Sequence, residues 1–153
     1  MKEFEFNYQQ EITVLLNEYL SNIAVLTVKL YNFHWNIVGL DFFTTHQKLE
    51  EYYQETTDIY DEVGERIKQL GGFPITSLTT YTQISQIKEL ASKNYKQSEI
   101  IMVLINDFSY MIEITNYIIR SANKGLDEAT TAIFSEYLVF FEKQLWMLKA
   151  HLN

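Results

Sequence analysis

Apolar side chains recur every three or four positions along most of this chain, which is the spacing of amphipathic helices. Four long helices are predicted, over residues 7–36, 42–70, 93–123 and from 127 past 148. Glycine and proline stand where a helix should end, since Gly71, Gly72 and Pro74 follow the second stretch and Gly125 follows the third. The pattern therefore predicts an all-α protein.

The segment between the second and third predicted helices is long, and it is too rich in threonine and serine for a full bundle helix. We predict one short helix within it, over residues 81–91. A long connection in a four-helix bundle joins two helices that run parallel. We therefore expect residues 1–153 to form a single domain, a four-helix bundle with a short extra helix in its middle link.

The predicted helix over residues 42–70 carries a core-facing stripe with a polar row beside it. The stripe steps by three, four or seven positions and consists of Leu49, Tyr53, Tyr60, Val63, Ile67 and Leu70. The polar row consists of His46, Glu50, Asp61 and Glu65. At 100° per residue, all four lie within roughly a quarter-turn of one another on the flank of the stripe. Imidazole and carboxylate groups together suit iron, manganese or zinc, so the row indicates a metal site.

The two ends of this row are too far apart to share an ion within one chain. His46 and Asp61 lie about 22 Å apart along the helix axis, whereas ligand atoms lie about 2.0–2.2 Å from a metal. An identical helix running antiparallel across a two-fold axis would bring the His46 end of one chain to the Asp61 end of the other. We therefore expect a homo-oligomer in which each two-fold pair of chains forms two equivalent metal sites.

The segment before this helix adds a further candidate ligand. His34 continues the apolar row of the first helix, so its ring is expected to face a packed surface. Gly39 is expected to adopt a left-handed turn, and Asp41 to cap the second helix. His151 lies near the C-terminus and is expected at the surface. A histidine taken singly is more often structural than metal-binding, so the metal interpretation depends on the combination.

Composition excludes several other chemistries. Cysteine is absent, which removes disulfides, thiolate catalysis and zinc-thiolate sites. The N-terminus has no apolar leader core and no run of about 18 apolar residues occurs, so we expect a cytoplasmic protein without a membrane span. Glycine-rich phosphate loops and nucleophile elbows are missing. The Glu-x-x-His pair of di-iron sites inside one bundle is also missing, which disfavours such a site within a single subunit.

The charge balance points toward cations as partners. The formal net charge is −8, and eight of the 20 acidic residues lie between positions 41 and 65. Binding to DNA or anionic lipid depends on lysine and arginine neutralising phosphates. Lys2 is followed by Glu3 and Glu5, so no lysine-rich tail is present at this end. We do not expect DNA binding.

Short motifs cluster densely between residues 32 and 74. They are Asn32-Phe-His-Trp-Asn36, Gly39, Phe43-x-x-His46, Asp61-Glu-Val-Gly-Glu-Arg66 and Leu70-Gly-Gly-x-Pro74. Together they resemble the mini-ferritins, also called Dps or DNA-binding proteins from starved cells. The resemblance implies a ferritin-like subunit that assembles into a hollow dodecamer with iron sites at its two-fold interfaces.

The resemblance also implies a function, which is iron storage and protection against oxidative stress. Such a ferroxidase oxidises Fe(II), preferentially with hydrogen peroxide, and keeps the ferric mineral inside the shell. By position, His34 and His46 would be the imidazole ligands of one subunit. Asp61 and Glu65 would be the carboxylate ligands of its partner, with Asp61 as the bridge between two irons. Zinc or manganese would compete for the site.

Two further positions carry open roles. Glu50 stands where many members of the family have aspartate, and it would bind metal directly or through water. Trp35 would lie close to the iron or pack at the interface. Asp127, Glu128 and Glu136 are candidates for lining a pore at a three-fold axis, although acids at a helix start and a solvated face explain them as well.

Two alternative functions stay open. One is a purely structural helical-bundle oligomer that binds no metal. The other is a DNA-compacting shell without ferroxidase activity, which would need a basic surface.

Overall fold

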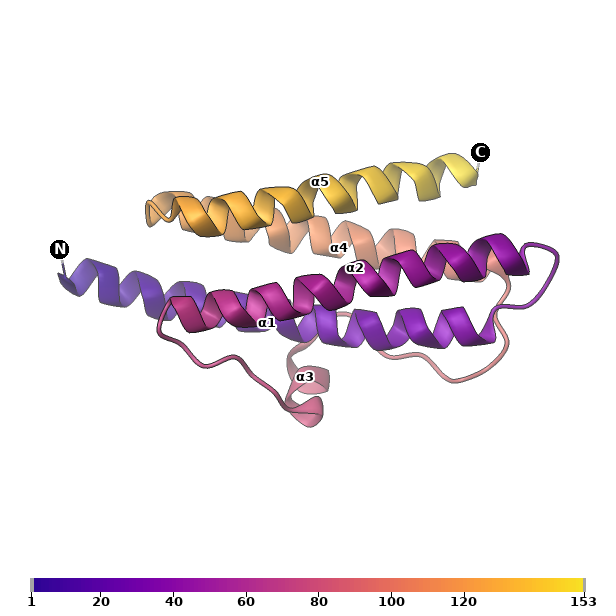
Figure 1. Ribbon diagram of the computed structural model, residues 1–153, viewed down its shortest axis with the longest axis horizontal. Helices are drawn as coiled ribbons and strands as arrows, with labels where there is room; N and C mark the ends of the chain where they lie inside the picture. The colour runs from indigo at the N-terminus through magenta and orange to yellow at the C-terminus, as the bar shows by residue number, and fades with distance from the viewer. Residues whose placement is uncertain (1, 153) are drawn as a thin grey trace.

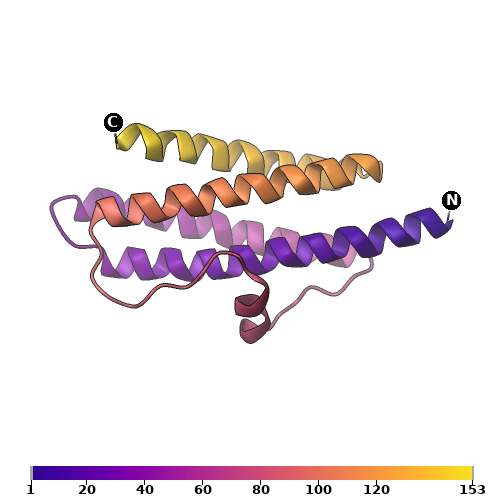
Figure 2. The same ribbon diagram turned by 180° about the vertical axis from the view of Figure 1, so that it is seen from behind.

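The computed structural model describes residues 2–152, with side chains described from residue 7 onward. Within this range it forms five helices and no strand, namely α1 (Lys2–Asn36), α2 (Phe42–Gln69), α3 (Leu78–Ile84), α4 (Gln97–Lys124) and α5 (Glu128–His151). The four long helices lie side by side as a bundle, and α3 lies outside it on the long link (Figure 1). Helices α2 and α4 run in the same direction, as the turned view also shows (Figure 2). The predicted all-α four-helix bundle with a short extra helix is confirmed.

The long helices differ from prediction mainly at their starts. α1 begins at Lys2 rather than near residue 7. α4 begins at Gln97 rather than near residue 93, because the residues before it are extended and pinned to the end of α1. The backbone N–H of Tyr95 donates to the oxygen of Asn36, and the N–H of Val38 donates to the oxygen of Tyr95, both at 2.9 Å.

The prediction of a short helix over residues 81–91 is wrong in its bounds. α3 begins earlier because the Ser77 hydroxyl accepts a hydrogen bond from the backbone N–H of Thr80 at 3.3 Å, which caps the helix. It ends earlier because a buried side chain of α1 captures the following backbone. The Oδ1 atom of Asn22 accepts hydrogen bonds from the N–H groups of Gln86 at 2.9 Å and Ile87 at 3.1 Å.

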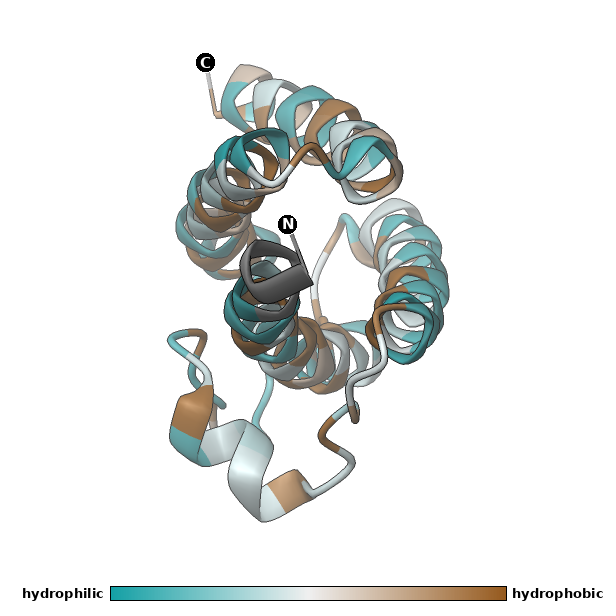
Figure 3. Cartoon of the chain, turned by 90° about the vertical axis from the view of Figure 1, so that its left-hand side faces the viewer, coloured by the Kyte–Doolittle hydropathy of each residue, from teal (hydrophilic) through white to brown (hydrophobic). Residues whose placement is uncertain are grey.

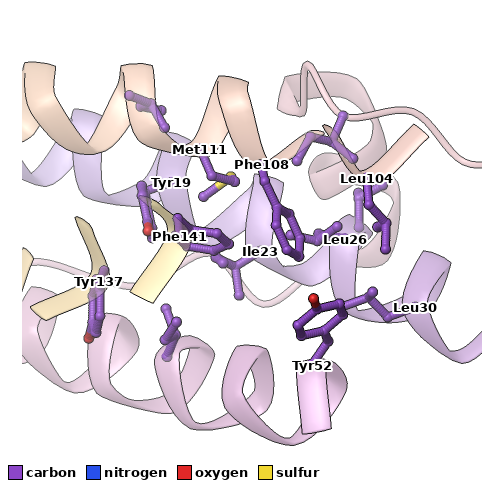
Figure 4. Packing of buried hydrophobic residues seen from close by; sticks show 14 of the residues in the cluster. Tyr19, Ile23, Leu26, Leu30, Tyr52, Leu104, Phe108, Met111, Tyr137 and Phe141 are labelled. Atoms are coloured by element: carbon purple, nitrogen blue, oxygen red, sulfur yellow. The ribbon is translucent and has the colours of Figure 1, made fainter. Parts of the chain in front are cut away.

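The bundle core is filled by aliphatic and aromatic side chains from all four long helices (Figure 4). Seen along the bundle, each long helix carries both hydrophobic and hydrophilic residues around its circumference (Figure 3). On α2 the predicted stripe is partly correct, since Leu49, Val63 and Ile67 are buried. The buried side chains between them are Tyr52, Thr56 and Ile59, whereas Tyr53 and Tyr60 are only half-buried.

The turn between α1 and α2 brings the predicted metal-binding segments together. Gly39 adopts a φ of 117°, which confirms the expected left-handed turn. Asp41 precedes α2, but its side chain makes no capping hydrogen bond, so the predicted cap is wrong. Its backbone oxygen instead accepts a hydrogen bond from the Thr44 hydroxyl at 3.2 Å. None of the described helices combines the length and apolarity needed to cross a membrane.

Candidate metal site

His34 and His46 face each other where the end of α1 meets the start of α2. The Nδ1 atom of each lies 2.7 Å from the backbone oxygen of the other, and the ring centres are 3.6 Å apart. Because a carbonyl oxygen only accepts, each Nδ1 carries a proton and donates it. The Nε2 atom of each neutral ring then holds the lone pair that can bind a metal. The two imidazoles are therefore fixed in orientation and in the tautomer that a metal requires.

Aromatic side chains hold this histidine pair in place. Phe42 stacks on His46 with ring centres 5.0 Å apart, and Tyr53 presents an edge to His34 at 5.1 Å. Tyr31 in turn stacks on Tyr53 at 4.0 Å. These supporting residues were missed by sequence reasoning. A signal existed for two of them, because Tyr31 and Phe42 stand three and four residues before the two histidines, within reach on one helix face.

Trp35 adjoins the pair but points outward. It is 70% exposed and contacts Tyr31, with ring centres 5.4 Å apart. A large aromatic side chain this exposed on the chain is available for contact with a partner. Both of its predicted roles, beside iron or in interface packing, stay predictions.

The carboxylates of the predicted row are less buried than the histidines. Glu50 is half-buried and accepts a hydrogen bond from the amide of Gln54 at 3.2 Å. Asp61 and Glu65 are exposed, and the side chain of neither makes a hydrogen bond or ion pair with another described residue. Arg66, although adjacent to Glu65, is turned away from it toward the start of α5. Neither carboxylate is therefore held by a side-chain contact within the described chain.

The described part of one chain does not contain a complete metal site. Among the residues that the structure describes, no three His, Asp or Glu side chains lie together as a group that could hold an ion. The structure brings His34 and His46 together and leaves Asp61 and Glu65 further along α2. The histidine pair lies where α1 ends and α2 begins, and the two carboxylates lie further along α2. That these two groups join across a two-fold axis to form a metal site stays a prediction.

Asp127 caps the start of α5. It accepts hydrogen bonds from the backbone N–H of Thr130 at 2.9 Å and from Tyr8 at 2.9 Å, and it pairs with Arg66 at 2.8 Å. Its side chain is largely buried, as the explanation by a helix-start acid expects, and a pore role for it stays a prediction. Glu128 and Glu136 are exposed. His151 is exposed as predicted.

Comparison with known proteins agrees with this fold. A family model of the ferritin-like domain matches residues 13–153. This match and the helix arrangement define the class of protein as ferritin-like. A DNA protection during starvation protein of Brevibacillus brevis is 38% identical over 145 residues, covering 95% of this chain and 97% of the relative. One from Helicobacter pylori is 31% identical over 138 residues, covering 90% and 96%.

Solved structures agree as well. A crystal structure of a Dps protein from Bacillus brevis superposes with a TM-score of 0.92 at 37% identity, covering 96% of this chain and 98% of the other. A Dps protein from Vibrio cholerae, described as a member of a broad superfamily of ferritin-like diiron-carboxylate proteins, gives 0.93 at 33% identity, covering 96% and 92%. The chain belongs to the Dps family.

Proposed function

We propose that this protein is a ferroxidase and an iron store. It binds Fe(II) at sites shared between two subunits, oxidises it with hydrogen peroxide and keeps the ferric product inside a shell of twelve chains. The observation that carries the proposal is the reciprocal bonding of His34 and His46, which directs two Nε2 atoms to one end of α2. Membership of the Dps family, and the diiron-carboxylate superfamily named for the Vibrio cholerae relative, support a role in iron storage and protection.

Each proposed site combines two imidazoles of one subunit with two carboxylates of its neighbour. His34 and His46 supply the neutral nitrogen ligands. Asp61 of the partner subunit bridges two irons, and Glu65 of the partner subunit completes the set. Glu50 lies one turn after His46 and acts directly or through a bound water. Zinc and manganese, which suit the same donors, compete with iron for the site.

The ligand charges favour oxidation of the bound iron. Attraction to a carboxylate grows with the charge of the metal, so the site stabilises the ferric product more than the ferrous substrate. Two Fe(II) ions give up one electron each. One hydrogen peroxide molecule takes both electrons and two protons, its O–O bond breaks, and two waters leave. Because both electrons pass in one event, hydroxyl radical is not released.

The test is iron oxidation by the purified, iron-free protein, followed by the absorbance of ferric iron. We expect oxidation to be much faster with hydrogen peroxide than with oxygen. The His34→Ala, Asp61→Ala double variant should lose this fast reaction. A Glu89→Gln variant, which removes an exposed acid outside the proposed site, should keep it. Equal rates for the wild type and the double variant would overturn the site assignment.

The assembly is tested on the same sample. Light scattering should give a mass of about 217 kDa, twelve times the 18.1 kDa of one chain. The same sample should also take up iron. A monomer or dimer without iron-dependent absorbance would support the purely structural alternative.

A further inference from the structure

A cleft separate from the histidine pair opens at one end of the bundle. It has a volume of about 250 Å³ and lies where α2 and α4 begin and α5 ends. These three helix ends lie together at the same end of the molecule (Figure 1). Its walls are mainly apolar and include Leu49, Ile101, Leu104 and Leu148. Neither His34 nor His46 lines it, so the proposed ferroxidase site leaves this cleft without a role.

Tyr52 contributes an unused hydrogen-bond donor to the cleft. The residue is only 2% exposed, yet its hydroxyl makes no hydrogen bond with any described residue. The hydroxyl points away from α2 toward Leu104 and Phe108 (Figure 4). Burial raises the pKa of Tyr52, so the hydroxyl keeps its proton at neutral pH and can donate it. Tyr52 is not among the described residues with a buried, unsatisfied side-chain atom, so its hydroxyl faces solvent in the cleft, where a ligand oxygen could replace water as its acceptor.

Lys48 places a positive charge over the ring of Tyr52, and both residues line the cleft. Its Nζ lies 5.1 Å from the centre of the Tyr52 ring, one helical turn earlier on α2. Lys48 also pairs with Glu51 at 2.7 Å, but the two side chains are 36% and 54% exposed. Ion pairs this exposed contribute little stability, so Lys48 can exchange Glu51 for another anion.

The charge around the cleft favours an anionic ligand. The chain has 20 acidic residues and a net charge of −8, yet no aspartate or glutamate is among the residues that line the cleft. The polar groups at its edge are ordered by one another. The amide of Gln97 donates to the Thr45 hydroxyl at 2.7 Å and accepts from Nε2 of His151 at 2.9 Å. This chain of hydrogen bonds joins α2, α4 and α5 around the cleft.

We propose that this cleft binds a small organic carboxylate whose head accepts hydrogen bonds from Lys48 and Tyr52 and whose apolar body packs against Leu104 and Leu148. A dry cavity of about 150 Å³ holds benzene. By proportion, this cleft holds about ten non-hydrogen atoms, which matches a ring or short chain with one carboxylate. The site depends neither on the iron chemistry nor on the histidine pair.

The experiment is equilibrium dialysis of radiolabelled benzoate against the purified full-length protein. We expect saturable binding with one benzoate per chain. Benzyl alcohol, which keeps the ring but lacks the charge, should bind several-fold more weakly, and benzylamine, with the opposite charge, should not bind. No saturable binding of benzoate, or equal binding of benzylamine, would overturn the proposal.

Variants locate the binding and separate it from general charge effects. Tyr52→Phe should weaken benzoate binding about tenfold, since a hydrogen bond to a charged group is lost. It should not lower the unfolding temperature, because the hydroxyl has no partner in the protein. Lys48→Gln should also weaken binding, whereas Glu51→Gln should leave it equal or tighter.

Lys93→Gln makes the same charge change outside the cleft and serves as the matched control. Its benzoate affinity should equal that of the wild type. If Tyr52→Phe and Lys48→Gln also bind like the wild type, or if Lys93→Gln weakens binding as much as they do, the cleft is not the site.

Discussion

The ammonium group of Lys29 lies 2.7 Å from the carboxylate of Asp107, and the two side chains, 3% and 12% exposed, form an ion pair buried between α1 and α4. Burial raises the pKa of Asp107, while the hydrogen bond and charge of Lys29 act in the opposite direction. Each buried charge is therefore stabilised by the opposite charge beside it. Removing one of them leaves a buried charge without a partner, which costs far more than the intact pair contributes.

We expect Lys29→Met to lower the free energy of unfolding by about 3–5 kcal/mol at neutral pH. The double variant Lys29→Met, Asp107→Leu should recover most of this loss, since no charge stays buried. In the single variant the folded-state pKa of Asp107 is raised further, so its stability should fall as pH rises through that value. Urea unfolding at pH 4 and pH 7, at a fixed protein concentration, measures both effects. Equal losses in the single and double variants would contradict this account.

Asp127 has the opposite pH behaviour. Burial alone would raise its pKa, but hydrogen bonds from Thr130 and Tyr8 and the charge of Arg66 outweigh it, so the pKa of Asp127 is lowered. A carboxyl with a lowered folded-state pKa stabilises the protein fully above its unfolded value of about 3.9. That stabilisation is lost as pH falls through the folded-state pKa.

We expect Asp127→Asn to isolate this charge effect, because asparagine also caps helices well. The variant should be less stable than the wild type at pH 6–7, and the difference should shrink as pH falls below about 4. Urea unfolding of both proteins across this pH range provides the measurement. A difference that is the same at every pH would mean that the carboxylate charge has no role.

The sequence predicted the long helices well because their ends are marked by local chemistry. Residues 42–70 were predicted for α2, and the helix ends at Gln69, one residue earlier. The prediction is this close because Gly71 and Gly72 mark the end of the helix in the sequence. The stripe on α2 was less predictable. Aromatic content favoured Tyr53 and Tyr60, but Thr56 takes a buried position because its hydroxyl bonds Thr27 at 2.8 Å. A polar residue satisfied by a distant partner cannot be recognised from periodicity alone.

The candidate site, like the fold, could be predicted only in part. His34 and His46 could be proposed from residue type and motif. Their reciprocal hydrogen bonds could not, because they depend on how the end of α1 crosses the start of α2. The end of α3 was also unpredictable, since it is set by Asn22, 63 residues from Ser85 in sequence. Such contacts between distant segments appear only once the helices have packed.

Protection by this protein should not require DNA binding. Each chain carries a net charge of −8, and an oligomer multiplies this charge and repels phosphate. We expect no retardation of duplex DNA by the wild type at neutral pH and moderate salt. A Glu3→Lys, Glu5→Lys variant, which turns the N-terminal segment basic, should retard DNA at low salt. A salt-sensitive shift by the wild type at physiological ionic strength would favour the DNA-compacting alternative.

Mixed oligomers test whether each iron site is shared between subunits. A His34→Ala, His46→Ala chain lacks every imidazole ligand, and an Asp61→Ala, Glu65→Ala chain lacks the partner carboxylates, so each should be inactive alone. In a two-fold pair containing one of each, one site loses all four ligands and the other regains all four. Random assembly of equal amounts should therefore restore about a quarter of the wild-type sites. Peroxide-dependent iron oxidation after co-refolding measures this recovery, with separately refolded and then mixed proteins as the control. If all four ligands acted within one chain, no mixture would recover activity.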